Sequence, residues 1–183
     1  TPVANMSRTM VLIYPRGIPL ASGRDQNYLF TALFEDSGTI LLERAGSQQF
    51  GNLSWYVVEF EDGVTVQRGF VTLKDTAVSK EVDINTFDMN KTFGILQLRA
   101  AFPTQNYTES LGGTLKLVDA DTINISRGVI DAAVLTAETY VYQVVEFSTD
   151  ASVQNGSVRM PYNNTTVAAT ISAVNLSKSF LIT

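Results

Sequence analysis

The sequence predicts an all-β protein made of two tandem antiparallel β-sandwich domains of about six strands each. Short runs rich in valine, isoleucine, threonine and aromatic residues alternate with turn residues, and no run has the apolar stripe of a helix. The chain of 183 residues also repeats itself. We place the first sandwich at residues 1–89 and the second, with a surplus C-terminal strand, at residues 90–183.

The longest repeated segment is "SWYVVEFEDGVTVQRGF" at 54–70, which aligns without a gap with "VYQVVEFSTDASVQNGS" at 141–157, 87 positions later. Trp55 falls on Tyr142 in this alignment. Two upstream segments repeat at a spacing of 83: "MSRTMVL" with "MNKTFGI", and "TILLER" with "TINISR". Because both spacings hold over separate segments, the sequence indicates a tandem duplication of a unit of about 85 residues.

Period-two patterns and turn residues define the predicted strands. Asp36 to Gly38 and the pair Asp62 and Gly63 mark two turns of the first unit. "WYVVEF" at 55–60 is largely apolar on both faces, which predicts a central strand. The predicted strands of the first unit are 8–14, 28–35, 39–44, 54–60, 64–73 and 80–87. Those of the second unit are 92–99, 113–118, 122–127, 140–147, 152–160 and 167–174, followed by a last strand at 178–182.

The start of the repeat occurs three times, at 7–12, 90–95 and 177–182, although two units need it only twice. Either the last copy pairs within this chain, or it is given to a neighbouring subunit as an added strand. Deletion of residues 175–183 separates the two alternatives, because only donation predicts a folded monomer that no longer assembles.

A glutamate recurs on the central strand of each unit, as Glu59 and Glu146, where an unpaired buried carboxylate is costly. Arg44 and Arg127 are the basic residues kept in both units alongside them. We therefore predict structural ion pairs between Glu59 and Arg44 and between Glu146 and Arg127. A residue needed for catalysis seldom has to appear in both copies, which favours this structural interpretation.

The composition argues against several classes of function. The net charge of −5 is unfavourable for a surface that follows nucleic-acid phosphates, so no nucleic-acid partner is expected. No apolar run approaches the length needed to cross a bilayer as a helix. The chain has no cysteine and no histidine, which removes disulfides, the usual zinc ligands and the commonest general base.

Carboxylates cluster in "FEDSG" at 34–38, "FEDG" at 60–63 and "VDADT" at 118–122. Such clusters suit a hard cation such as calcium, but they are also the ordinary composition of hairpin turns. No nucleophile elbow, phosphate-binding glycine loop or dinucleotide fingerprint occurs. We therefore predict a protein that is not an enzyme, with no catalytic residue, no metal and no cofactor.

Nine of the eleven asparagines lie in Asn-x-Ser/Thr acceptor sequences for N-glycosylation. The pattern is typical of a glycan-coated extracellular protein, and a threonine-rich β surface is the alternative explanation. The nine candidates are Asn5, Asn52, Asn90, Asn106, Asn124, Asn155, Asn163, Asn164 and Asn175.

The combination of a Lys-Ser-Phe strand, a "TI…R" strand, "W-x-VVEF" and "VQ-x-G" resembles a tandem β-repeat of predicted phage structural and bacterial surface proteins. The six-strand layout is also similar to H-type lectin domains. The first resemblance implies a structural subunit of a virion or extracellular surface assembly, as a homo-oligomer or polymer or with other particle proteins. The second implies the alternative, a carbohydrate-binding adhesin whose glycan contacts would include Tyr107 and Tyr162.

Overall fold

A computed structural model describes residues 2–16, 29–46, 51–74, 76–100, 112–127, 137–158 and 165–182 of the chain. The described part contains ten β-strands, two short 3₁₀ turns and no α-helix. The strands are β1 (Thr9–Arg16), β2 (Phe30–Phe34), β3 (Ile40–Arg44), β4 (Asn52–Glu59), β5 (Val64–Leu73), β6 (Ser79–Asp83), β7 (Thr92–Ala100), β8 (Gly113–Leu117), β9 (Thr122–Arg127) and β10 (Glu138–Phe147). The 3₁₀ turns are η1 (Met6–Arg8) and η4 (Leu176–Lys178).

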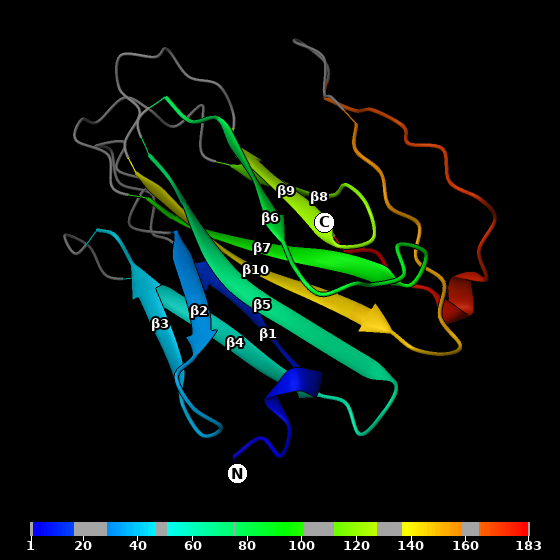
Figure 1. Cartoon of the computed structure of the whole chain (residues 1–183), viewed down its shortest axis with the longest axis horizontal. Coiled ribbons are helices and arrows are strands. Elements are labelled where there is room, and N and C mark those ends of the chain that lie inside the picture. The colour runs from blue at the N-terminus through cyan, green and yellow to red at the C-terminus, as the bar shows by residue number, and fades with distance from the viewer. Residues whose placement is uncertain are drawn as a thin grey trace.

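The ten strands form four antiparallel sheets, which group into two pairs (Figure 1). One pair consists of two three-stranded sheets, ordered β5-β10-β7 and β6-β9-β8, and is called the second sandwich from here on. The other pair consists of two two-stranded sheets, β1-β4 and β2-β3, and is called the first sandwich. The all-β, antiparallel fold predicted from the periodicity is therefore confirmed. None of the described elements is a helix long and apolar enough to span a membrane.

Ten of the thirteen predicted strands coincide with β1 to β10. The prediction is wrong for the last three, because the described residues of 152–160, 167–174 and 178–182 carry no strand hydrogen-bond ladder. This C-terminal segment leaves the sheets and runs along the outside of the molecule (Figure 1). Its sequence has strand character, but a strand needs a neighbour to receive its backbone N–H and C=O groups.

The two repeats are interlocked by strand pairing across the repeat boundary. β5 and β6 precede residue 90, but β5 pairs with β10 and β6 pairs with β9. In register, Gly69 of β5 lies opposite Tyr142 of β10, and Val66 lies opposite Val145. Each sheet of the second sandwich thus obtains its third strand from the preceding repeat.

The main core lies between the β5-β10-β7 and β6-β9-β8 sheets and includes the fully buried Ile123, Ile125 and Tyr140. The opposite face of the β5-β10-β7 sheet is also covered, since Val145 belongs to a second cluster against which Met10 of β1 packs. A sheet buried on both faces explains why the apolar residues of β10 run almost without alternation. Burial of this kind supplies most of the stability of such a fold.

Polar side chains connect β1 to the face of the β5-β10-β7 sheet. The amide of Gln143 accepts the N–H of Val11 at 2.8 Å and donates to the C=O of Val11 at 2.7 Å. Gln97 accepts the N–H of Ala32 in β2 at 2.7 Å. These buried amides satisfy backbone groups at strand edges that would otherwise be left without partners.

Candidate assembly interface

The same strand of the repeat has different neighbours in the two sandwiches. β10 lies between β5 and β7 and is the central strand of its sheet. Its counterpart β4, which was predicted to be a central strand from the two apolar faces of residues 55–60, pairs with β1, the counterpart of β7, and with no other described strand. The prediction of a central strand is therefore wrong for β4 among the described residues. The edge of β4 that corresponds to the β5-binding edge of β10 is therefore open within the described part of the chain.

The second sheet of each sandwich repeats this difference. β9 pairs with β8 on one edge and with β6 on the other. Its counterpart β3 pairs with β2, the counterpart of β8, and the described residues place no strand on its other edge. Among the described strands, the first sandwich thus lacks the equivalents of both β5 and β6.

Exposed apolar side chains line the part of the first sandwich where these strands are missing. Trp55 of β4 is 53% exposed, whereas its counterpart Tyr142 is 7% exposed. Leu42 of β3 is 37% exposed, whereas its counterpart Ile125 is fully buried. As far as the structure describes the chain, the first sandwich is an incomplete copy of the second, and apolar side chains of its inner surface are exposed.

The described C-terminal segment carries the sequence of the two missing strands. Residues 151–158 correspond to the first part of β5, and 166–170 correspond to β6, both at the spacing of 87. The segment exposes Val158, Ile171 and Val174 to solvent. We call the described residues 148–158 and 165–182 the tail.

The counterparts of these three tail residues are core residues of the second sandwich. They are Val71 of β5 and, after β6, Ile84 and Phe87. Val71 and Phe87 are buried in the main core, and Ile84 packs against it. The exposed apolar residues of the tail therefore occupy positions at which the repeat fills a core.

The two halves of the tail are held together as β5 and β6 are. The Gln67 amide donates to the C=O of Asn85 at 2.8 Å and accepts its N–H at 2.7 Å. Gln154 makes the same pair of bonds with Ser172, at 3.2 and 2.7 Å. The tail thus repeats the side-chain bridge between β5 and the residue Asn85 that follows β6, although its described residues belong to no sheet.

The base of the tail is attached to its own repeat in the same way as β5. Arg68 donates to the C=O groups of Met6 and Thr9, and burial lowers the pKa of its guanidinium group. Asn155, its counterpart, donates to the C=O of Met89 at 3.2 Å and of Thr92 at 3.1 Å. A neutral amide replaces the guanidinium, but the backbone groups that it binds are equivalent.

The turn that starts the tail also repeats the turn before β5. Gly63 has a φ of 72°, and its counterpart Asp150 has a φ of 57°, the one positive φ among the described residues other than glycine. Aspartate tolerates this left-handed conformation better than most residues. The turn that begins the tail therefore has a left-handed residue at the same position as the turn that leads into β5.

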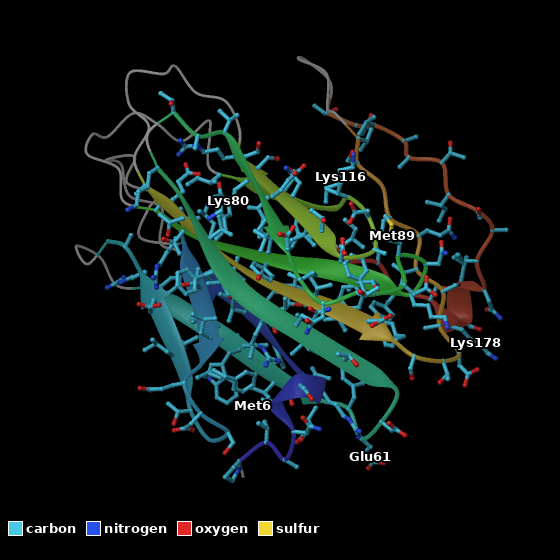
Figure 2. The ribbon with its side chains drawn as sticks, in the orientation of Figure 1. Met6, Glu61, Lys80, Met89, Lys116 and Lys178 are labelled. Atoms are coloured by element: carbon cyan, nitrogen blue, oxygen red, sulfur yellow. The ribbon has the colours of Figure 1, made fainter. Side chains whose placement is uncertain are left out.

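A capped turn occurs at the start of the repeat in all three copies. The Asn5 side chain accepts the N–H of Ser7 at 3.0 Å, and Asn175 accepts that of Ser177 at 3.1 Å. Asp88 accepts the N–H of Asn90 at 2.9 Å in the middle copy. Figure 2 labels Met6, Met89 and Lys178 in these turns.

The repeated glutamates bind backbone groups of these turns. Glu59 accepts the N–H of Asn5 at 2.7 Å, and Glu146 accepts the N–H of Asp88 at 2.8 Å. Glu59 and Arg44 form no ion pair with each other, nor do Glu146 and Arg127, among the described side chains. The recurrence of the glutamates has a structural cause, because each glutamate, near the end of β4 or β10, binds the turn that precedes the neighbouring strand β1 or β7.

Arg44 and Arg127 lie in different surroundings. The guanidinium of Arg44 lies over the ring of Phe30, 5.9 Å from its centroid. Arg127 is buried, and its Nη1 atom lies 4.0 Å from Oε2 of Glu138. The same Glu138 oxygen accepts a 2.5 Å hydrogen bond from the hydroxyl of Tyr140. Burial raises the pKa of Glu138. The pKa of Tyr140 is raised by its burial and by the adjacent Glu138 carboxylate. This enclosed cluster is a structural element of the second sandwich.

The structure places six of the nine candidate glycosylation asparagines. Asn5, Asn90 and Asn175 belong to the capped turns, Asn155 binds backbone C=O groups, and Asn52 and Asn124 lie in β4 and β9. The amide nitrogen of Asn155, where a glycan would be attached, is engaged in two hydrogen bonds. Asn106, Asn163 and Asn164 lie outside the described residues, as do Tyr107 and Tyr162.

The carboxylate-rich turns do not form a recognisable cation site. No group of three or more Asp or Glu side chains in the described ranges is arranged to hold a metal.

The open edges of β3 and β4 were not predicted from the sequence. Their signal was present in the alignment, because the apolar residues of the tail fall on core positions of the first repeat.

Comparisons with known proteins identify no relative of the chain. No protein-family model, no curated protein and no solved structure matches it.

Proposed function

We propose that this chain is a non-enzymatic structural subunit that joins its neighbours through β-strand edges in an extended assembly, on a virion or an extracellular surface. The observation that supports this function is the incomplete first sandwich, where the open edges of β3 and β4 adjoin the exposed Trp55 and Leu42. Open edges beside apolar surface are an aggregation hazard unless a partner covers them.

The proposal includes an ordered polymer or incorporation into a particle. The test is the molar mass of the native protein measured by light scattering across a concentration series, with electron microscopy of the largest species. Regular filaments, tubes or rings of repeating units support the function. A monomer at every concentration, or amorphous aggregates alone, would count against it.

Neither an adhesin nor an enzyme has a specific observation in its favour. Tyr107 and Tyr162, the residues considered for glycan contact, lie outside the described part of the chain. The buried Glu138–Tyr140 pair lies within a core, so it offers no access to a substrate. Self-assembly is therefore the function that the described residues favour.

A further inference from the structure

We infer that the tail of one copy of this chain completes the first sandwich of a second copy, with residues 151–158 added to β4 and residues 166–170 added to β3. The inference rests on the proposed function and specifies the partner and the strand register. The occupant is a second copy because the tail carries the sequence of the missing strands and the hydrogen bonds that shape them.

The register follows from the pairing within the second sandwich. Because Gly69 lies opposite Tyr142, Gly156 of the donor comes to lie opposite Trp55 of the acceptor. Val153 then lies opposite Val58, as Val66 lies opposite Val145. In the other sheet, Lys80 pairs with Ile125, so the equivalent Val167 is placed opposite Leu42.

The recurrence of glycine at position 156 is explained by this register. In the second sandwich the ring of Tyr142 lies against Gly69, and a Cβ there would come within 2.7 Å of the Tyr142 Cζ atom. A Cβ on Gly156 meets nothing within 4 Å. The isolated fold therefore does not require glycine at 156, whereas an acceptor that places the Trp55 ring there does.

The apolar residues of the tail then obtain a core. Val158 and Ile171 occupy the positions of Val71 and Ile84, which belong to or pack against the core of the second sandwich. The donor strand covers the aromatic ring of Trp55 in the way that β5 covers the ring of Tyr142. Removal of these apolar surfaces from water provides the driving force, and the new backbone hydrogen bonds provide the register.

The acceptor limits the inserted segment at its C-terminal end. In the second sandwich, Phe87 donates its N–H to the C=O of Ala120 at 2.7 Å. The counterpart of Ala120 is Ser37, whose C=O already accepts the N–H of Val3 of its own chain at 2.7 Å. The donated segment therefore ends near Ile171, and residues 175–182 remain outside the acceptor.

The donor and acceptor surfaces differ, so the contact is heterologous and leaves a free tail and an open sandwich at the two ends of every oligomer that does not close into a ring. The tail projects from the side of the molecule away from β3 and β4 (Figure 1). Successive copies consequently join head to tail, and the assembly grows without a change in the contact.

The test uses the 183-residue chain, produced in a host without N-glycosylation, because Asn155 lies within the donor strand. Trp55 is the single tryptophan, so its emission reports directly on the acceptor site. We expect the emission to shift to the blue as sedimentation velocity shows the mass rising with concentration. An emission spectrum that stays unchanged while the mass rises overturns the inference.

The donor is tested by Gly156→Val, with Gly69→Val as the matched control. Gly156→Val is expected to fold with an unchanged melting temperature and to self-associate about tenfold to a hundredfold more weakly, from the cost of overpacking against Trp55. Gly69→Val is expected to destabilise the monomer itself. Wild-type association of Gly156→Val would show that assembly uses another surface, which overturns this inference and leaves the proposed function intact.

The acceptor is tested by Leu42→Lys, which places a charge in the open sandwich. Leu42→Lys and Gly156→Val are each expected to remain monomeric at concentrations where the wild type polymerises. Mixed, they should form a one-to-one dimer, because the intact tail of the first fits the intact acceptor of the second. A mixture that stays monomeric overturns the inference, and a wild-type chain that never associates overturns the proposed function as well.

Deletion of residues 175–183 tests the limit of the inserted segment. We expect the truncated chain to assemble as the full chain does, since these residues lie beyond the pairing. Loss of assembly from a folded truncated chain would mean that the third copy of the turn and strand replaces β1 of the acceptor, which contradicts the register limit proposed here.

Discussion

The two sandwiches are built from one repeat, but the described strands complete only the second. Its central strands β9 and β10 each have two neighbours, whereas β3 and β4 each have one. The same difference separates the buried Tyr142 and Ile125 from the exposed Trp55 and Leu42. Equivalent side chains are core in one place and surface in the other because strands from a preceding repeat cover only one of them.

The largest expected effect compares the two sheet centres. Ile125→Ala should lower the free energy of unfolding by about 2–5 kcal/mol, because it leaves a cavity in a packed core. Leu42→Ala should cost less than about 1 kcal/mol in the monomer, since Leu42 is partly exposed. Chemical denaturation of both variants at low protein concentration measures the difference. Equal losses would show that the first sandwich is already closed.

The next effect concerns Gln143 and its counterpart Tyr56. Gln143→Leu removes both hydrogen bonds to Val11 and leaves its buried N–H and C=O without partners, at a cost of about 1–3 kcal/mol. Tyr56 is exposed and packs edge-on against Tyr14, so Tyr56→Leu should change stability by less than about 0.5 kcal/mol. Urea midpoints of the two variants test this. A larger loss of stability in Tyr56→Leu than in Gln143→Leu would contradict this difference between the two sandwiches.

The pH dependence distinguishes the second sandwich from the first through Glu138, which has Gly51 as its counterpart. Burial raises the folded-state pKa of Glu138, so its protonated form is favoured by folding. The stability that this provides is fully present below the unfolded pKa of about 4.3 and is lost as the pH rises through the folded pKa.

Denaturation of wild type and Glu138→Gln between pH 4 and 7 measures this contribution. The wild type should lose stability relative to the Gln variant as the pH rises, because only the wild type must release a proton from the core. A constant difference across this range would mean that Glu138 is ionised throughout.

The smallest expected effect concerns the turns with positive φ. Gly63→Ala should cost about 1 kcal/mol, because the turn before β5 holds a left-handed residue at φ 72°. Asp150→Gly should change monomer stability by less than about 0.5 kcal/mol, since its turn leads only to the exposed tail. Thermal melts of the two variants are the measurement. A large stabilisation by Asp150→Gly would show that strain at this turn is significant.

The sequence alone predicted the strand positions well, because alternation of apolar residues is a local property. β5 was predicted at 64–73, where the structure has it, and β9 was likewise predicted at 122–127. Among the described residues, Glu59 accepts the backbone N–H of Asn5, a bond that the pattern of recurring glutamates fits as well as it fits the predicted ion pair with Arg44. Recurrence shows that a residue is needed, but it does not identify the atom that the residue binds.

What the sequence determined by itself is the repeat, its strands, and the polar and apolar faces of each strand. Only the tertiary structure decided that β5 and β6 complete the following repeat rather than their own. The physical reason is that period two specifies which way a side chain points, whereas backbone hydrogen bonds have the same chemistry for every partner. The choice of neighbour depends on packing between distant segments, such as Tyr142 against Gly69, and that information exists only once the chain is folded.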